Sequence, residues 1–405
     1  MTNKIETSHA GSLPRSAELI AANAARTFAE DGLTLERTAE FDELLANAVE
    51  QLVARQLAAG ITIPGDGEYG KAMSSAVDYG AWWSYSFQRT NGLEVTGAEI
   101  WEQQPLRSTP GNVRLTSFPD RRDRNLFAAA YSDTEHPITT GKIATAFPTT
   151  TGPLSYKGHE AVANDVTNLR SALDAQGVEN GFITALSPGS GARIADQYYG
   201  NDRDHLWAWA ESQREEYRAI VDGGLILQID DPSIAENWDQ INPEPTIDEY
   251  REFTQLRVDA LNYALEGIDP ERVRFHLCWG SWHGPHVTDI EFKHIADLML
   301  QINAKYYSFE AANVRHEHEW KIWKDIELPK GKVLVPGIVS HATNVVEHPE
   351  LVADRIENFA NIVGPENVIA STDCGLGGRI HPDIAWAKLE SLGEGAQIAA
   401  KRLFG

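Results

Sequence analysis

The chain is poor in cysteine, in long apolar runs and in basic residues, and each shortage excludes a class of protein. Its 405 residues include two cysteines, Cys278 and Cys374, which are too few for a disulfide framework. No apolar run approaches the length of about 18 residues that a transmembrane helix requires. The N-terminal sequence MTNKIETSHAGSLPR also lacks the apolar stretch of a secretory signal. We therefore expect a cytoplasmic protein with no membrane partner.

The shortage of basic residues also limits the partners of the protein. Lys and Arg number 35 against 59 Asp and Glu, which gives a formal net charge of −24. Such a surface repels nucleic acid and anionic membranes at long range. We expect small-molecule partners instead, and the sequence leaves room for a homo-oligomer.

Short runs rich in β-branched residues alternate with longer helical patterns, such as TAEFDELLANAVEQLVARQLAAG, along the chain. The expected strands cover residues 3–9, 60–66, 181–186, 224–230, 272–278, 305–310, 332–339 and 367–372. Strand–helix alternation predicts an α/β fold with parallel pairing, and eight such units predict a closed (β/α)8 TIM barrel. The alternative is an open, doubly wound sheet.

Residues 80–170 interrupt this alternation with proline, glycine, threonine and short strand-like runs. We interpret this segment as an insertion after the second strand, which forms antiparallel strands and covers the barrel mouth. No linker separates it from the rest, so residues 1–405 are expected to form one domain with an elaborated loop.

Chemistry in a TIM barrel lies at the carboxyl ends of the strands. The run RFHLCWGSW closes one expected strand, and its His276 and Cys278 are two residues apart, so they point to the same side. Glu310 and Cys374 lie at the ends of two other strands. One imidazole, two thiolates and one carboxylate form a tetrahedral zinc site. Three other histidines compete for a ligand role: His283, His316 and His318.

A zinc ion with two thiolate ligands binds an incoming thiol, lowers its pKa and presents a thiolate near neutral pH. A thiolate is the nucleophile for alkyl transfer, so this pattern favours a zinc-dependent thiol S-alkyltransferase. The alternative is structural, because buried cysteines are usually inert core residues. A carboxylate such as Glu310 is, by itself, typical of a helix cap or a surface position.

Six segments near the expected strand ends resemble segments of the cobalamin-independent methionine synthase family. In chain order they are SHAGSLPR, GDGEYGK, LQIDDPSIAE, FHLCWG, YSFEAAN and STDCGL, and they span residues 7–378. The chain is similar to the C-terminal catalytic barrel of that family and to its short, single-barrel relatives. The resemblance implies zinc-dependent methyl transfer from a small alkyl donor to homocysteine or a similar amino-acid thiol.

The resemblance also implies roles for individual residues. Zinc is bound by the imidazole, the two thiolates and the carboxylate named above. Gly11 and Ser12 contact the amino-acid part of the thiol, and Glu68 and Asp230 bind its ammonium group. His341, one residue before the family position of the proton donor, is assigned to catalysis together with Asp230. The structural alternatives are carboxylates that cap the next helix and a histidine that holds its loop.

Two further residues are candidates for substrate binding. Trp279, together with Trp282, would form an aromatic wall for an alkyl group, or alternatively a core pair beside the barrel. Arg15 follows the first-strand turn and would bind a carboxylate or a sulfonate.

Three functions therefore stay open. The first is methyl or alkyl transfer to homocysteine or a related thiol, which Glu68 and Asp230 favour because they suit an amino-acid thiol. The second is thiol addition to an epoxide, or the reverse lyase reaction, which a basic patch at the mouth would favour. The third is a noncatalytic zinc-binding barrel, whose four ligands would not exchange with a thiol.

Overall fold

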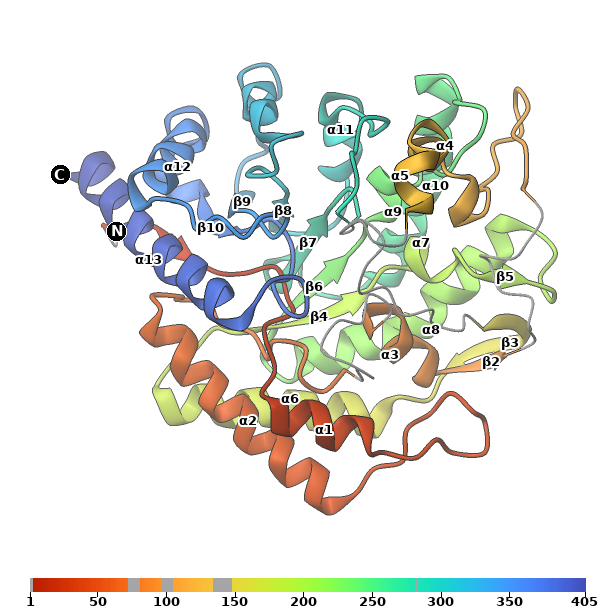
Figure 1. The fold of residues 1–405 in the computed structure, drawn as a ribbon, viewed down its shortest axis with the longest axis horizontal. Coiled ribbons are helices and arrows are strands. Elements are labelled where there is room, and N and C mark those ends of the chain that lie inside the picture. The colour runs from red at the N-terminus through yellow and green to blue at the C-terminus, as the bar shows by residue number, and fades with distance from the viewer. Residues whose placement is uncertain (1–2, 72–80, 96–104, 134–147, 281–282) are drawn as a thin grey trace.

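A computed structural model describes residues 3–71, 81–95, 105–133, 148–280 and 283–405 (Figure 1). One parallel sheet contains seven strands in the order β1-β10-β9-β8-β7-β6-β4. Their bounds are Glu6–Thr7 (β1), Phe182–Leu186 (β4), Ile226–Asp230 (β6), Val273–Leu277 (β7), Tyr306–Phe309 (β8), Val333–Val339 (β9) and Ile369–Thr372 (β10). This order runs in one direction along the chain, as in a barrel, and lacks the reversal of a doubly wound sheet. The predicted α/β class is confirmed, with a curled parallel sheet.

The expected strand at 60–66 is the exception, because it is not a regular strand. Its residues lie between the edge strands β1 and β4. The N–H groups of Thr62 and Ile63 donate to the carbonyl of Thr7 at 3.1 and 2.9 Å, and Phe182 donates to the carbonyl of Pro64 at 3.1 Å. Pro64 has no N–H to donate to a neighbouring strand, which explains the irregular pairing here.

Long helices surround the sheet in Figure 1, and one of them covers the expected helical segment TAEFDELLANAVEQLVARQLAAG. They are Ala39–Ala58 (α2), His159–Gln176 (α6), Asp202–Asp222 (α8), Ile247–Ala264 (α10), Pro349–Val363 (α12) and Pro382–Phe404 (α13). Side chains cap the N-termini of several of these helices. At the start of α10, for example, Thr246 and Glu249 form a capping box. Among the described residues, no helix has both the length and the apolar character needed to cross a membrane.

Short helical turns connect these elements. The α-helical ones are Ala17–Ala24 (α1), Ala81–Gln88 (α3), Arg122–Leu126 (α4), Ala128–Ser132 (α5), Pro188–Gly191 (α7), Ser233–Glu236 (α9) and Ala296–Met299 (α11). The 3-10 turns are Phe118–Asp120 (η1), Pro270–Arg272 (η2), Phe292–His294 (η3), Glu317–Lys324 (η4) and Pro365–Asn367 (η5). Several of them follow the carboxyl ends of strands and shape the loops there.

A second sheet has three strands, of which two lie in the segment expected to be an insertion and one lies after it. Thr90–Glu94 (β2) pairs antiparallel with Thr149–Tyr156 (β3), and Ala195–Asp196 (β5) pairs parallel with β3. Helix α6 begins at His159, so the expected segment 80–170 overlaps this helix. Its role as a cover over the mouth stays a prediction.

Arg89, directly before β2, connects this part of the chain to the helices of the main sheet. Its buried guanidinium contacts Asp165 of α6 at 2.6 Å and Glu216 of α8 at 2.5 Å. Because both carboxylates are buried, the contacts fix the start of β2 against the two helices.

Candidate active site

The carboxyl ends of β6, β7, β8 and β10 bring polar side chains together. Asp230 is paired in register with His276, and His276 with Ser308. Parallel strands place such residues at one level, so Cys278, which follows β7, and Glu310, which follows β8, lie beyond them at the same edge.

His276, Cys278 and Cys374 form a compact group, in which the potential ligand atoms all lie within 4.8 Å of one another. All three residues are buried. The Nδ1 atom of His276 lies 2.9 Å from the hydroxyl of Ser308, which fixes the ring. Its Nε2 atom has no nitrogen or oxygen hydrogen-bond partner among the described residues. This buried nitrogen is therefore available to a metal ion.

The two thiols interact directly. A hydrogen bond from Cys278 lowers the pKa of Cys374 well below its usual value, against the opposing effect of burial. The same hydrogen bond, together with burial, raises the pKa of Cys278 well above its usual value. The two sulfurs thus lie within hydrogen-bonding reach of each other, and a soft metal cation is suited to bind both.

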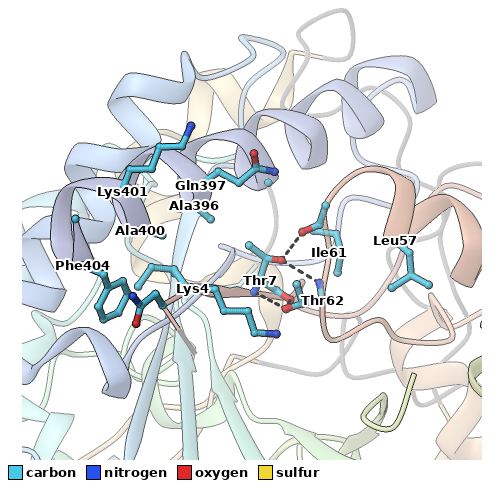
Figure 2. A pocket seen from close by; sticks show the side chains of 15 residues that line it. Lys4, Thr7, Leu57, Ile61, Thr62, Ala396, Gln397, Ala400, Lys401 and Phe404 are labelled. Carbon is cyan, nitrogen blue, oxygen red and sulfur yellow. Dashed lines mark hydrogen bonds between the residues drawn. The ribbon is translucent and has the colours of Figure 1, made fainter. Parts of the chain in front are cut away.

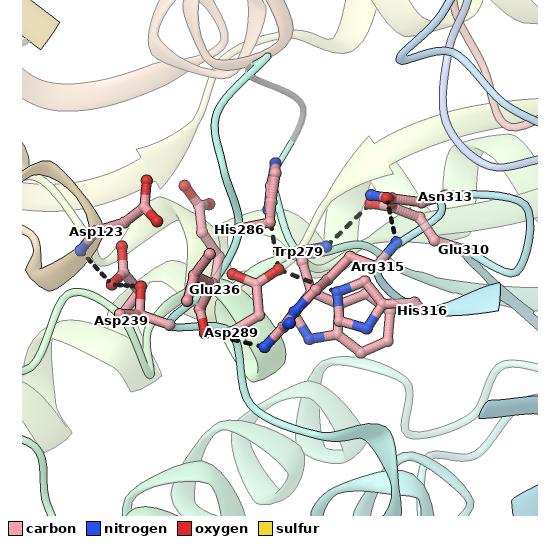
Figure 3. A network of polar contacts seen from close by, with 12 residues as sticks. Asp123, Glu236, Asp239, Trp279, His286, Asp289, Glu310, Asn313, Arg315 and His316 are labelled. Carbon is pink, nitrogen blue, oxygen red and sulfur yellow. Dashed lines mark hydrogen bonds and ion pairs between the residues drawn. The ribbon is translucent and has the colours of Figure 1, made fainter. Parts of the chain in front are cut away.

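Glu310 belongs to a second buried group, with His341 and Asp373, whose potential ligand atoms also lie within 4.8 Å of one another. Its two oxygens accept hydrogen bonds from the backbone N–H of Trp279 at 3.1 Å and from the amide of Asn313 at 3.0 Å (Figure 3). Burial raises the pKa of Glu310, and the nearby Cys374 adds to this effect. The structure thus groups Glu310 with His341 and Asp373, and not with the other three predicted ligands, although Cys374 is near enough to raise the pKa of Glu310.

His341 is a buried member of this second group. Burial lowers its pKa to about 3, so the imidazole is neutral at neutral pH. Its Nδ1 atom has no hydrogen-bond partner in the described part of the chain. A neutral ring can donate a hydrogen bond, but it must first take up a proton before it can act as the predicted proton donor.

Asp373 was not assigned a role from the sequence, although it directly precedes Cys374. One carboxylate oxygen, Oδ1, accepts hydrogen bonds of 2.8 Å from the backbone N–H groups of both Ala311 and Ala312. Burial, and then the proximity of Glu310, raise the pKa of Asp373 well above its usual value. Its place within the STDCGL segment was the available signal.

Glu68 and Gly11 are brought together at the other side of the site. Glu68 adopts a left-handed backbone conformation, with φ 61°, and its Oε1 atom accepts a hydrogen bond of 2.8 Å from Thr184. A Cβ atom on Gly11 would lie 2.7 Å from the same oxygen, and Gly11 has φ +127°. Glycine is therefore required here both for space and for backbone conformation.

A buried lysine, Lys71, shares this corner and was missed from the sequence. Its ammonium lies 3.5 Å from Oε1 of Glu68 and donates to the hydroxyl of Thr184. The segment GDGEYGK contains it, but only the loop conformation returns the side chain to Glu68.

Asp230 ends β6, and Ser12 lies in the turn that follows β1. The amide of Gln228 donates to Asp230 at 2.7 Å, while burial, with Glu68 nearby, raises the pKa of Asp230 to about 6. The carbonyl of Ser12 accepts the N–H groups of Leu376 and Gly377 at 2.8 and 3.0 Å. The first-strand turn is thereby held against the loop that follows Cys374.

Trp279 has the core position that the sequence left as an alternative. Its fully buried indole donates to the carbonyl of Ile290 at 2.9 Å and stacks on His316, with ring centroids 3.8 Å apart. Its backbone N–H, and not its ring, contacts Glu310. Its expected aromatic partner, Trp282, lies outside the described residues.

The side chain of Arg15 contacts backbone groups of the protein itself. Its guanidinium donates to the backbone carbonyls of Glu68 and Lys71, the latter at 3.0 Å. These contacts hold the loop that carries Glu68, which is a structural use of the side chain. Its predicted binding of a substrate anion stays untested.

The competing histidines lie in other settings. His316 lies between two carboxylates, with Nδ1 2.8 Å from Glu319 and Nε2 3.0 Å from Asp289 (Figure 3). Burial lowers its pKa, but these contacts outweigh burial and raise the value to about 9. A protonated imidazole does not bind a metal ion. His318 is exposed on η4, and His283 is not a member of either group.

A separate pocket lies at the opposite, amino-terminal end of the strands. It has a volume of about 750 Å³, and its lining includes Lys4, Thr62, Gln397 and Phe404 (Figure 2). Thr7 donates through its hydroxyl to the carbonyl of Gly60 at 2.6 Å on one wall. This pocket contains no residue of the two groups described above.

Comparisons with known proteins were made for sequence and for structure. No protein-family model matches the chain. It is 23% identical over 228 residues to a methionine synthase of Sulfurisphaera tokodaii. This alignment covers 56% of the chain and 58% of that protein. It is 25% identical over 238 residues to the 2-hydroxypropyl-CoM lyase of Xanthobacter autotrophicus, covering 51% of the chain and 58% of the lyase. The chain thus spans little more than half the length of these curated relatives.

Solved structures agree over nearly the whole chain. A B12-independent methionine synthase from Shewanella sp. W3-18-1, in complex with selenomethionine, aligns over 99% of both chains with a TM-score of 0.68 and 20% identity. A putative vitamin-B12 independent methionine synthase from Listeria monocytogenes aligns over 98% of this chain and 97% of its own, with a TM-score of 0.60 and 17% identity. These similarities show the fold.

Proposed function

The chain belongs to the cobalamin-independent methionine synthase family, in its short single-barrel form, and we propose that it transfers a methyl or other alkyl group to the thiolate of a small thiol. Homocysteine is the first acceptor to test, because two of the related proteins are methionine synthases. The observation that carries the proposal is the buried group of one imidazole and two thiols at the carboxyl ends of β7 and β10.

We propose zinc as the metal of this site, with Glu310 as the fourth ligand beside His276, Cys278 and Cys374. A nitrogen, two sulfurs and a carboxylate suit tetrahedral zinc. The buried Nε2 atom of His276 and the close approach of the two sulfurs support the assignment. When bound there, zinc supplies a lowered pKa for the substrate thiol, so that a thiolate is present near neutral pH.

The surrounding residues of the chain orient these groups. Ser308 fixes the ring of His276, and Trp279 and Asn313 fix the two oxygens of Glu310. Partners of this kind determine ligand orientation and contribute to metal affinity. The thiolate then attacks an electrophilic carbon, and the electron pair of the broken bond leaves with the donor. His341 accepts the proton that the thiol releases and passes it to that leaving group, while Asp230, Gly11 and Ser12 position the acceptor.

A second candidate reaction is the opening of an epoxide by the same thiolate. Two observations favour it: the similarity to a 2-hydroxypropyl-CoM lyase and the cation of Lys71 beside Glu68. The nucleophile is common to both reactions, and only the attacked carbon differs. In the epoxide reaction His341 protonates the alkoxide that forms when the ring opens.

We also propose that residues 61–65 complete a closed barrel and that residues 80–170 cover its mouth. The hydrogen bonds from this irregular segment to both edge strands support the first statement. The ion pairs of Arg121 with Glu236 at 2.7 Å and with Asp239 at 2.8 Å support the second, because they join the segment to the residues that follow β6.

The first experiment measures metal content by plasma mass spectrometry in the purified chain and in the Cys278→Ser/Cys374→Ser double variant. About one zinc per chain is expected in the wild type, and its loss is expected in the double variant. The matched control is His318→Ala, at an exposed histidine outside the group, which should retain zinc. An unchanged zinc content in the double variant would contradict the assignment of the two cysteines as zinc ligands.

The second experiment identifies the reaction by mass spectrometry of thioether products. Zinc-loaded protein is incubated with homocysteine or another small thiol, together with a methylated amine, a sulfonium compound or a short epoxide. The His341→Asn variant should lose turnover and keep thiol binding, because it lacks only the proton donor. If no thiol alters the ligand field of a cobalt-substituted site, the noncatalytic zinc barrel is the better description.

A further inference from the structure

Lys71 places a fixed cation inside the corner that the sequence assigned to a substrate ammonium group. Three groups position its side chain: the carboxylate of Glu68 at 3.5 Å, the hydroxyl of Thr184, and the ring of Tyr85, whose centroid lies 4.2 Å from the ammonium. Lys71 is buried, and a lysine is rarely buried without such partners.

The carboxylate of Glu68 is consequently already engaged. Its Oε1 atom faces the ammonium of Lys71, accepts a hydrogen bond from Thr184, and lies where only a glycine, Gly11, leaves room. A second ammonium at this oxygen would meet a like charge in a buried setting, and like charges juxtaposed at a binding site oppose binding strongly.

We propose that Lys71 takes the place of a substrate ammonium beside Glu68, so that the site selects small thiols with an anionic group and without an α-ammonium group. The inference rests on the proposed function, because it concerns the acceptor of the same thiolate chemistry. A carboxylate and a sulfonate share the required chemistry, since both pair with an ammonium ion.

The test uses thiol binding to the cobalt-substituted chain, read from the absorption of the cobalt–thiolate bond. Four thiols are titrated: the anions 4-mercaptobutanoate and 2-mercaptoethanesulfonate, the zwitterion homocysteine and the cation cysteamine. Homocysteine differs from 4-mercaptobutanoate only by its ammonium group. We expect the two anionic thiols to bind about tenfold or more tightly than homocysteine, and cysteamine, which has a cation alone, to bind weakest. The comparison of the two anionic thiols distinguishes a carboxylate acceptor from a sulfonate acceptor.

The Lys71→Met variant removes the cation and retains a long side chain. In this variant we expect homocysteine to gain affinity and 4-mercaptobutanoate to lose it, which reverses their order. Lys71→Arg should retain the wild-type order because it preserves the charge. Thermal unfolding of both variants shows whether they are folded, and the wild-type thiol series stands without any variant.

Tighter binding of homocysteine than of 4-mercaptobutanoate to the wild type would overturn the inference and leave the proposed function intact. An unchanged order in a folded Lys71→Met variant would do the same. Failure of every thiol to form a cobalt–thiolate bond would overturn the proposed function and the inference together. These results are therefore distinguishable.

Discussion

Asp373 accepts a hydrogen bond of 2.8 Å from the backbone N–H of Ala311, and the same oxygen accepts one from Ala312. Asp373 precedes Cys374, and Ala311 follows Glu310, so the two bonds connect the loops that carry two proposed zinc ligands. The Asp373→Ala substitution leaves two buried donors unpaired. We expect it to reduce the free energy of unfolding by about 2 kcal/mol or more and zinc affinity by about 10–100-fold.

Competition with a chelating dye measures the zinc affinity of this variant, and urea unfolding measures its stability. Asp325→Ala, at an exposed position after η4, is the matched control and should change neither. Unaltered zinc affinity in Asp373→Ala would show that the Glu310 loop keeps its place without these hydrogen bonds.

Gly11 tests the geometry around Glu68 and Lys71. An alanine Cβ would lie 2.7 Å from Oε1 of Glu68, and the backbone φ of +127° is unfavourable for any residue with a Cβ. Gly11→Ala should therefore displace the Glu68–Lys71 pair, weaken thiol binding to the cobalt-substituted chain, and cost about 1–3 kcal/mol of stability. Gly32→Ala is the control, because Gly32 also has a positive φ, +67°, but nothing lies within 4 Å of its Cβ position. Equal thiol affinity in the two variants would contradict the placement of Gly11.

The strands and the sulfur group were predictable from the sequence because both depend on local periodicity. His276 lies in β7 and Cys278 directly follows this strand, and a parallel sheet brings Cys374 to the same edge. The expected strand at 60–66 failed for an equally local reason. Pro64 removes a ladder donor, and side-chain bonds of Thr62 to Thr7 replace part of the regular pairing.

The residues that were missed, or placed differently, depend on neighbours far away in the chain. Lys71 lies beside Glu68, whose backbone φ is positive, and Thr184 of β4 completes the contact. Trp279 is a core residue because Ile290 and His316 surround its ring, and no local pattern indicates this packing. The sequence therefore identifies the candidate metal ligands more readily than the residues beside them, such as Lys71, that would determine which thiol binds.

Arg89 should be among the most important residues for stability. Its guanidinium is buried between Asp165 and Glu216, so Arg89→Met leaves two buried carboxylates without their cation. Loss of one partner from a buried ion pair typically costs about 3–5 kcal/mol. Arg170→Met is the control, because Arg170 pairs with Asp174, which is 68% exposed, and exposed pairs contribute roughly 1 kcal/mol or less. Urea unfolding measures the free energy of unfolding of the two variants. Similar losses of stability in both would contradict this interpretation.

His9 should make the stability of the protein dependent on pH. Its Nε2 atom lies 2.8 Å from the Oε1 atom of Gln56, and its Nδ1 atom accepts the N–H of Gly11 at 3.3 Å, an arrangement that uses the neutral ring. Burial, with Arg274 nearby, lowers the pKa of His9 from 6.5 to about 3. The unfolded chain therefore binds a proton near pH 6.5 that the folded chain does not. This contribution to stability is present above pH 6.5 and is lost as the pH falls towards 3.

The difference between the wild type and His9→Gln isolates this contribution, because the titration of the other groups cancels. From pH 7.5 to 5.5 the stability advantage of the wild type should shrink by about 1.3 kcal/mol, since the unfolded histidine becomes protonated over this range. Between pH 7.5 and 8.5 the difference should stay constant, because the ring is neutral in both states. Urea unfolding at the three pH values measures it. A difference that stays constant down to pH 5.5 would mean that His9 takes up its proton in the folded protein, and that its buried hydrogen bonds tolerate the charged ring.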